Sequence, residues 1–237
     1  MSYLINLNII IIFVEKIILI DKPKNWTSND VVQKIKHTCK FKKVGHAGTL
    51  DPNATGLLIL AYDEDTKKLN DLLIETKQYE CWVCFGIETN TGDVTGQIIY
   101  QDNTKIKKRK LIKAIKNLSN NSYYQTPHKF SAIKINGKKA YEYARQNKEI
   151  KIEPKLVKLN NFKIINFDKK EKILHIIIDV SKGFYVRSFC KDIADQLKTH
   201  ATLNNLRRLK CGNYKIEDAL KIEDFITKWK SNITTCN

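Results

Sequence analysis

The stretch Gly45–Gly56, which reads GHAGTLDPNATG, places one carboxylate, that of Asp51, among residues that favour tight turns. Glycine reaches backbone angles that other residues avoid, so we expect Gly45 and Gly48 to adopt such angles just before Asp51. Pro52 fixes its own φ and pushes Asp51 towards an extended conformation. The stretch therefore predicts a loop that aims a single carboxylate.

Helix capping is the alternative role for Asp51. An aspartate followed by proline is also a common helix start, in which the aspartate is the N-cap and the proline is the first helical residue. Local chemistry alone favours the cap, because capping aspartates are commoner than catalytic ones. Both interpretations stay open until the rest of the chain is considered.

The composition indicates a polyanionic partner. The chain has 237 residues, enough to bury a substantial core in one large domain or two small ones, and its 42 Lys and Arg against 25 Asp and Glu give a formal charge of +17. Such an excess favours nucleic-acid binding that weakens as salt rises. A compositional bias of the source genome towards lysine is the competing explanation.

The cysteines do not indicate a disulfide framework or a metal site. Cys81 and Cys84 form a C-x-x-C pair, but no second Cys or His pair lies nearby in the sequence. Both fall in Gln78–Phe85, which reads as a strand, so their side chains are expected on opposite faces. We therefore expect no metal, and reduced thiols in a cytoplasmic protein.

The amino-terminal residues 1–14 are expected to form a hydrophobic leader or an extra strand. Leu4–Val14 is apolar, yet it lacks the charged start and the small-residue cleavage site of a signal peptide. Glu15 and Lys16 end it well short of the roughly 20 residues that span a bilayer. We expect no membrane association.

Hydrophobic periodicity predicts alternating short strands and helices without an internal repeat. Thr27 and Asp30 have the spacing of a capping box. The predicted helices are one from this box with Val31, Val32 and Ile35 inward, Thr66–Glu75 with Leu69, Leu72 and Leu73 inward, Lys105–Leu118, Ala140–Gln146, one from the Arg187 region to Leu197, and Glu223–Trp229. The predicted strands are Ile17–Ile20, Leu57–Ala61, Gln78–Phe85, Leu156–Phe167 and Ile173–Ser181, with a hairpin turn at Asn136-Gly137.

The string Gly45–Gly56 resembles the signature loop of the TruB family of tRNA pseudouridine synthases, in which the aspartate is the catalytic residue. Segments on either side resemble further TruB motifs, in family order from Ile17 to Leu220. These segments are Asp21-Lys22-Pro23 with Thr27-Ser28, Lys77–Glu80, Gly86–Gly96, Ser131–Arg145, Ser181–Arg187 and Leu206–Gly212. His128 and Phe130 depart from the pattern, because the family usually has a proline and a tyrosine at these positions.

The resemblance implies the roles of three site residues. Asp51 is the nucleophile, Tyr79 stacks on the target base and Arg187 pairs with Asp51. From its own surroundings, Tyr79 could also be an ordinary strand aromatic, because it lies two residues from Cys81 and so on the same face of the predicted strand. Arg187 lies near a helix start, where a buried arginine is unusual without an acidic partner.

Four further residues receive substrate-binding roles from the resemblance, each beside a simpler alternative. His46 fills the space that a flipped base vacates, or is a plain loop histidine. Lys22 supports the active site, or is a surface lysine. Leu206 lines the uracil pocket, or belongs to the core. Tyr185 lies in the Ser181–Arg187 motif.

The resemblance implies an α+β pseudouridine synthase fold, in which helices flank a mixed, mostly antiparallel sheet and the site lies in a basic cleft. The expected catalytic domain is 15–230, with a tRNA-gripping insertion at about 125–153 and a tail at 231–237. The chain is expected to be a short form without the carboxy-terminal PUA-like domain of many relatives. A cytoplasmic monomer is expected to isomerise uridine 55 in the tRNA T-arm without a cofactor or a protein partner. The alternatives are a guide-RNA-directed synthase, a non-catalytic tRNA-folding module, and a glycosidase-like hydrolase, which usually needs two carboxylates.

Overall fold

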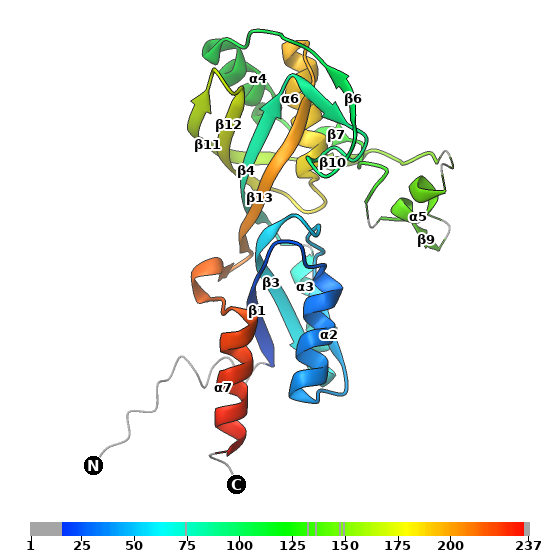
Figure 1. Cartoon of the computed structure of the whole chain (residues 1–237), viewed down its shortest axis with the longest axis vertical. Coiled ribbons are helices and arrows are strands. Elements are labelled where there is room, and N and C mark those ends of the chain that lie inside the picture. Colours follow the sequence, from blue (N-terminus) through cyan, green and yellow to red (C-terminus); the bar gives the residue numbers. More distant parts are fainter. Residues whose placement is uncertain are drawn as a thin grey trace, which may run out of the picture. The chain divides into compact units, whose positions relative to one another are not determined.

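The chain folds into two compact units, and Figure 1 gives the labels of their elements. Unit 1 comprises the chain up to Glu75 and again from Arg208, and unit 2 is Thr76–Arg207. Strand β13 (Ala201–Cys211) passes from unit 2 into unit 1. The computed structural model describes residues 16–73, 75–131, 133–135, 137–146, 148 and 150–234, so the expected leader and the last three residues of the tail lie outside it.

Three antiparallel strands frame the stretch that carries Asp51 in unit 1. β1 (Ile17–Lys22) pairs with β3 (Thr55–Tyr62), and β2 (Val44–Ala47) pairs with β3 as well. Because β2 and β3 are consecutive and antiparallel, residues 48–54 are the connection of a β-hairpin. The hydrophobic run of β3 is buried on both faces, as expected of a strand that is covered from two sides.

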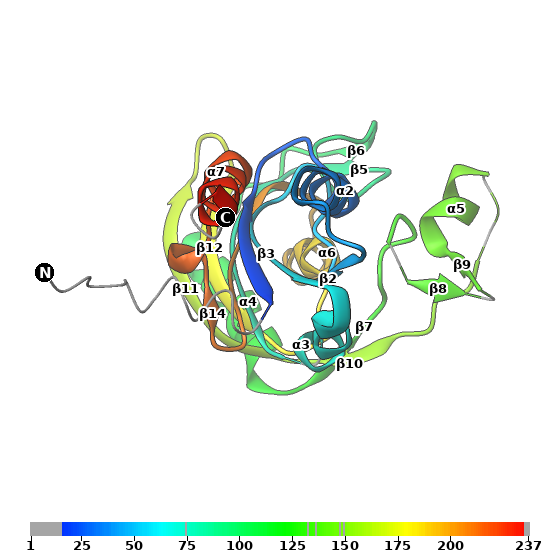
Figure 2. The ribbon, with the colours of Figure 1, turned by 90° about the horizontal axis from the view of Figure 1, so that it is seen from below.

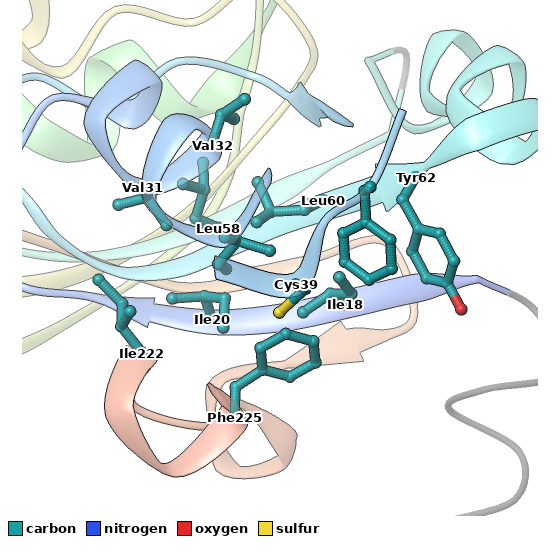
Figure 3. Close-up of a cluster of buried hydrophobic side chains, with 12 residues drawn as sticks. Ile18, Ile20, Val31, Val32, Cys39, Leu58, Leu60, Tyr62, Ile222 and Phe225 are labelled. Carbon is teal, nitrogen blue, oxygen red and sulfur yellow. The ribbon is translucent and has the colours of Figure 1, made fainter. Parts of the chain in front are cut away.

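Helices cover both faces of β1 and β3 within unit 1. α2 (Ser28–Cys39) begins with the predicted capping box of Thr27 and Asp30, and α7 (Ile222–Thr234) packs against it. Figure 3 shows the cluster that the two helices form with β1 and β3, which includes Ile20, Leu58 and Phe225. Leu57 and Ile59 are the residues of β3 that point to the other face of the strand, where they pack with Leu69. Figure 2 shows α2 and α3 (Leu69–Leu73) on opposite sides of β3.

The predicted helix Thr66–Glu75 is shorter than expected and begins differently. Asp63–Lys68 forms a 3₁₀ helix, and α3 covers only Leu69–Leu73. Leu69 is buried as predicted, but Leu73 is 47% exposed, which contradicts its predicted inward position. The reason is length: α3 ends at Leu73, so this side chain lies beyond the core that covers Leu69.

Unit 2 is built on the antiparallel strands β4 (Lys77–Phe85), β12 (Ile173–Val180) and β11 (Leu159–Asp168). In β4, burial alternates strictly from Tyr79 to Phe85. Cys81 is buried and Cys84 lies on the other face, as the strand period predicts. α4 (Lys108–Asn120) contacts both β11 and α6 (Val186–Leu197), which ends at Leu197 as predicted.

The strand predicted at Leu156–Phe167 is in fact two strands. β10 (Lys155–Val157) pairs with β7 (Tyr123–Gln125), whereas β11 pairs with β12. Lys158 lies between them, and its backbone N–H donates to Ser181 Oγ at 2.8 Å. The chain changes pairing partner at this residue, so hydrophobicity alone does not reveal the break.

The segment expected as the insertion carries a short hairpin and a short helix. β8 (Lys134–Ile135) pairs with β9 (Lys138–Lys139), which confirms the hairpin, although Asn136 of its turn lies outside the described residues. α5 (Ala140–Arg145) follows directly. Tyr141 of α5 has two cations over its ring, the ammonium of Lys139 at 5.5 Å and the guanidinium of Arg145 at 5.2 Å.

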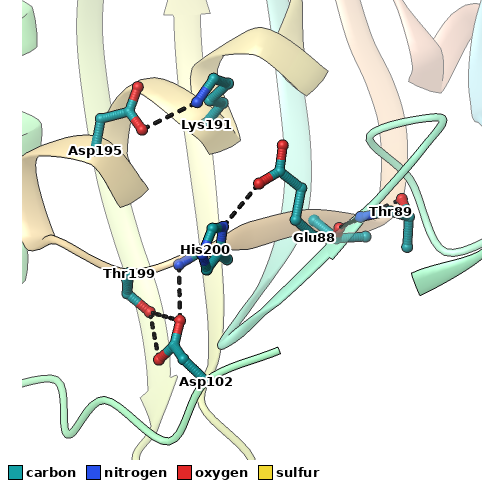
Figure 4. A network of polar contacts seen from close by, with 8 residues as sticks. Glu88, Thr89, Asp102, Lys191, Asp195, Thr199 and His200 are labelled. Carbon is teal, nitrogen blue, oxygen red and sulfur yellow. Dashed lines mark hydrogen bonds and ion pairs between the residues drawn. The ribbon is translucent and has the colours of Figure 1, made fainter. Parts of the chain in front are cut away.

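A polar network in unit 2 fastens the hairpin of β5 (Ile87–Thr89) and β6 (Ile98–Gln101) to the start of β13 (Figure 4). Asp102 accepts hydrogen bonds from Thr199 Oγ1 at 2.8 Å and from the His200 backbone N–H at 3.1 Å. Burial would raise the pKa of Asp102, but the hydrogen bonds that it accepts lower it well below its ordinary value. The His200 ring lies 2.7 Å from Glu88 Oε2.

The predicted fold class is confirmed. The pairs β1–β3, β2–β3, β4–β12 and β11–β12 are antiparallel, and two isolated bridges, Ile20 to Leu220 and Asp93 to Leu203, are parallel. The remaining short elements are β14 (Tyr214–Lys215) and the 3₁₀ helix Ile216–Asp218. The architecture is α+β, with a mixed and mostly antiparallel sheet flanked by helices.

Candidate active site

Gly45 and Gly48, the two glycines shortly before Asp51, occupy their positions for different reasons. Gly48 has a φ of +76°, in the left-handed region that favours glycine, as predicted. Gly45 lies within β2 and has no such angle, so the prediction for it is wrong. Close packing is the feature that favours a glycine here: a Cβ at Gly45 would lie 2.9 Å from Leu69 Cδ1, so the Leu69 side chain would have to shift.

Asp51 does not begin a helix. The Ala54 backbone N–H donates to the Asp51 carbonyl oxygen at 3.0 Å, which closes a turn that leads directly into β3. The capping alternative is therefore contradicted, because no helix follows Pro52. Asp51 is half-buried at the tip of the connection, so its carboxylate is held by a turn on a rigid hairpin.

Two backbone anchors hold the connection against the start of α2. The hydroxyl of Ser28 accepts from the Leu50 N–H at 2.9 Å and donates to the Leu50 carbonyl oxygen at 3.2 Å. The Asn25 N–H donates to the Pro52 carbonyl oxygen at 2.8 Å. Residues on both sides of Asp51 are therefore fixed, which limits the positions that its side chain can take.

Lys22 lies fully buried behind this connection. Its ammonium donates to three carbonyl oxygens, those of Trp26 at 2.6 Å, Pro23 at 2.9 Å and Pro52 at 3.3 Å. Burial lowers the pKa of Lys22 to about 8, and the opposing attraction of Asp51 acts to raise it. A cation therefore lies within electrostatic reach of the Asp51 carboxylate and favours its ionised form.

Arg208 is the second buried cation of unit 1, with 1% of its surface exposed. Its Nε donates to the Leu57 carbonyl oxygen at 2.7 Å and its Nη2 to the Gly48 carbonyl oxygen at 3.1 Å. The guanidinium thus joins the start of the connection to β3. His46 precedes the connection on β2, where it is half-buried and opposite Leu60.

Tyr79 lies in the first half of β4 in unit 2, where 9% of its surface is exposed. It shares the buried face of the strand with Cys81, Val83 and Phe85, and Ile178 is its partner on β12. The strand pairing thus fixes the backbone at Tyr79, and burial restricts the space that its ring can take. Leu206 of β13 is 8% exposed.

Tyr185 occupies the N-cap position of α6, and a chain of polar contacts holds it there. Its backbone N–H donates to Gln125 Oε1 at 2.7 Å, and Gln125 Nε2 donates to Asp192 Oδ2 at 2.9 Å. The hydroxyl of Tyr123 also donates to Asp192, at 3.0 Å. Burial raises the pKa of Asp192 despite these hydrogen bonds.

Arg187 is half-buried in the first turn of α6. Its Nη1 donates to the Thr91 carbonyl oxygen and its Nη2 to the Phe130 carbonyl oxygen, both at 2.9 Å. Thr91 belongs to the connection between β5 and β6, in which Asp93 Oδ1 accepts from the Thr95 N–H at 3.0 Å. Two carbonyl groups therefore set the direction of the guanidinium.

His128 occupies one of the two positions that depart from the family pattern. Burial lowers its pKa to about 4, and the charge of Arg187 acts in the same direction. The ring is therefore neutral at pH 7, and its Nδ1 accepts from the Phe130 N–H at 3.3 Å. A Cβ at Gly92 would lie 3.2 Å from the His128 ring, so the histidine packs closely against the turn that Arg187 contacts.

Sequence reasoning missed the supporting roles of Arg208, Ser28 and Gln125. A weak signal for Arg208 exists: the strand period places it on the same face as Leu206, so a cation was to be expected on a buried face. Ser28 and Gln125 gave no comparable signal, because their hydrogen bonds join segments that are distant in the sequence.

Metal-binding clusters and membrane-spanning helices are both absent from the described residues. No group of three or more His, Cys, Asp or Glu side chains is arranged to hold a metal ion in that part of the chain. Among the described helices, none is long and apolar enough to cross a membrane.

The chain is similar to pseudouridine synthases in sequence and in fold. Residues 36–186 match the model of the TruB family pseudouridylate synthase (N terminal domain). The tRNA pseudouridine synthase B of Ureaplasma urealyticum is 52% identical over 92% of this chain and 95% of its own length. That of Aquifex aeolicus is 37% identical over 89% and 73%. The crystal structure of a Cbf5-Nop10-Gar1 complex shares the fold, with a TM-score of 0.71 and 24% identity over 91% of this chain and 56% of that one.

Proposed function

The chain belongs to the TruB family of pseudouridine synthases, and we propose that it isomerises uridine to pseudouridine at position 55 in the T-arm of tRNA. The reaction breaks the bond between ribose and a ring nitrogen of uracil and joins the ribose to a ring carbon. Oxidation state and atom count are unchanged, so the reaction needs no redox cofactor and no group donor.

Asp51 is the proposed nucleophile. The observation that carries the proposal is the way this carboxylate is mounted: a turn on a hairpin, anchored at Leu50 and Pro52, with the ammonium of Lys22 in electrostatic reach. A nucleophilic carboxylate must be ionised and held in place, and this arrangement supports both requirements. We assign to Lys22 the role of supporting the Asp51 turn from behind.

Arg187 is the proposed counter-charge of Asp51. A cation beside a carboxylate lowers its pKa and fixes its orientation. The hydrogen bonds from Arg187 to the carbonyl oxygens of Thr91 and Phe130 support this role, because they hold the guanidinium in one direction.

The remaining assigned residues bind the target nucleotide. A uridine must leave its stack before a carboxylate reaches it, which costs a few kcal/mol. Stacking on the ring of Tyr79 recovers about 1–3 kcal/mol of this cost. We assign to His46 the role of filling the space that the flipped uridine vacates and to Leu206 that of lining the uracil pocket. Tyr185 is assigned to substrate binding as well.

The enzyme is proposed to act in the cytoplasm as a monomer, on tRNA alone. The monomeric state and the action on tRNA alone are tested together. The purified chain is incubated with an unmodified tRNA transcript, pseudouridine is mapped, and the molecular mass of the active species is measured. We expect modification at position 55 by a monomer, and none in a transcript that carries cytidine there. Modification elsewhere would refute the specificity.

The same experiment separates the rival functions. Activity that appears only with a guide RNA and accessory proteins would indicate a guide-directed synthase. Binding of tRNA without any pseudouridine would indicate a non-catalytic tRNA-folding module.

A further inference from the structure

Helix α4 carries a row of cations along its solvent side, and we propose that this row binds the phosphate backbone of the substrate tRNA. The inference rests on the proposed function, because it assigns a second contact surface to the same RNA. The row consists of Arg109, Lys113 and Lys116 and is called the α4 row below; all three side chains are exposed.

The packing of α4 determines which way this row faces. The helix buries Leu111, Ala114, Ile115 and Leu118 on the side where it contacts β11 and α6. At 3.6 residues per turn, the α4 row lies on the opposite side of the helix. Figure 1 shows α4 next to α6 at one end of unit 2. The α4 row is therefore directed to solvent and available to a partner.

The charges of α4 repel one another without a compensating anion. Arg109 and Lys113 are four residues apart and Lys113 and Lys116 are three apart, which makes them neighbours on the helix surface. Lys108 and Lys110 add cations to the first turn, where the helix dipole favours anions instead. In the part of the chain that the structure describes, no carboxylate forms an ion pair with any of these five side chains.

A general excess of lysine does not explain this arrangement. The other described helices of similar length all mix the two signs: α2 contains Asp30, α6 contains Asp192 and Asp195, and α7 contains Glu223 and Asp224. α4 has no acidic residue along its whole length. Its sequence therefore favours an anion that comes from another molecule.

The dimensions of the α4 row fit a nucleic-acid strand. Seven residues of helix separate Arg109 from Lys116, which corresponds to about 10 Å along the axis. One strand of a duplex presents a phosphate about every 3.4 Å of its axis, so the row spans about three phosphates. Exposed cations on a rigid helix are suited to contacts that add affinity without reading sequence.

The test compares two variants that lose the same charge. In the first, R109Q, K113Q and K116Q remove the α4 row; glutamine is a good helix former, and like-charge repulsion is relieved, so the melting temperature should not fall. The control carries K163Q, K169Q and K170Q, three exposed lysines of β11 and the turn that follows it. Affinity for an unmodified tRNA transcript is measured at several salt concentrations, and kcat is measured at saturating tRNA.

We expect the slope of log affinity against log salt to become shallower by about 2–3 for the α4 variant, since each phosphate contact contributes about 0.9. The control should change it by less than about 1, and kcat should be unchanged in both. An unaltered slope in the α4 variant, or an equal loss in the control, would overturn the proposal. If the wild type forms no pseudouridine but the α4 variant still shows the shallower slope, the proposed function is refuted, and the α4 row is shown only to bind tRNA.

Discussion

Arg208 donates a hydrogen bond from Nη2 to the carbonyl oxygen of Gly48 at 3.1 Å, across 160 positions of sequence. The same guanidinium contacts the Leu57 carbonyl oxygen, so one buried side chain ties together the two ends of the segment that presents Asp51. The position of the carboxylate thus depends on a residue that the carboxy-terminal end of β13 supplies.

Replacing Arg208 by methionine should lower both activity and stability. The substitution leaves the carbonyl oxygens of Gly48 and Leu57 without this donor, which we expect to cost about 3 kcal/mol of unfolding free energy. A displaced Asp51 should lower kcat more than it raises KM, and R208K should recover part of both losses. Denaturant titration and initial rates measure these quantities. Wild-type kcat in R208M would show that the contact does not position the nucleophile.

Gly48 should tolerate alanine less well than a glycine in open space. Gly48 and Gly137 both have positive φ, +76° and +81°. A Cβ at Gly48 would lie 3.2 Å from Arg208 Nη1, whereas one at Gly137 would meet nothing within 4 Å. Both substitutions carry a backbone cost of about 1 kcal/mol, and G48A should add a loss of activity. Equal activity of G48A and G137A would argue against the role of the Arg208 contact.

Lys22 should make stability depend on pH in a defined window. Burial lowers its pKa from 10.5 to about 8, so between these values the unfolded chain holds a proton that the folded chain has released. The unfolding free energy should therefore rise from about pH 8 to about pH 10.5. Relative to K22M, the rise should total about 3 kcal/mol. Parallel curves for the two proteins in denaturant titrations across this range would contradict the burial of the charge.

Arg187→Ala should lose most of its activity. If Arg187 is the counter-charge of Asp51, its removal should raise the pKa of the carboxylate and shift the acid limb of the pH–rate profile upwards. R187K keeps the positive charge but loses the two Nη donors of the guanidinium. Compared with R187A, it should therefore bring the acid limb of the pH–rate profile back towards the wild-type position, while the maximal rate recovers less. A silent R187A would show that the proposed ion pair is wrong.

Local signals predicted much of the fold. The capping box of Thr27 and Asp30, the alternation along β4 and the end of α6 at Leu197 each depend on neighbours within a few residues, and all three are confirmed. The α+β class was predicted differently: it followed from the family resemblance, because the motifs occur in family order along the chain.

Contacts between distant segments account for the rest. Gly45 is a glycine because Leu69 packs against it, and the strand after Leu156 breaks where Ser181 contacts Lys158. The strand period indicates that Arg208 is buried, but the carbonyl groups that accept its hydrogen bonds lie more than a hundred residues away. Periodicity contains no information about such partners, so these features emerge only from the three-dimensional structure.

The most direct test of the central claim is pseudouridine formation by Asp51→Asn on an unmodified tRNA transcript. Asparagine keeps the size and polarity of the side chain but removes the negative charge, so folding and tRNA affinity should match the wild type. We predict that no pseudouridine forms at position 55 in D51N under conditions in which the wild type completes the reaction. Pseudouridine formation at the wild-type rate in D51N would contradict the assignment of Asp51 as the nucleophile.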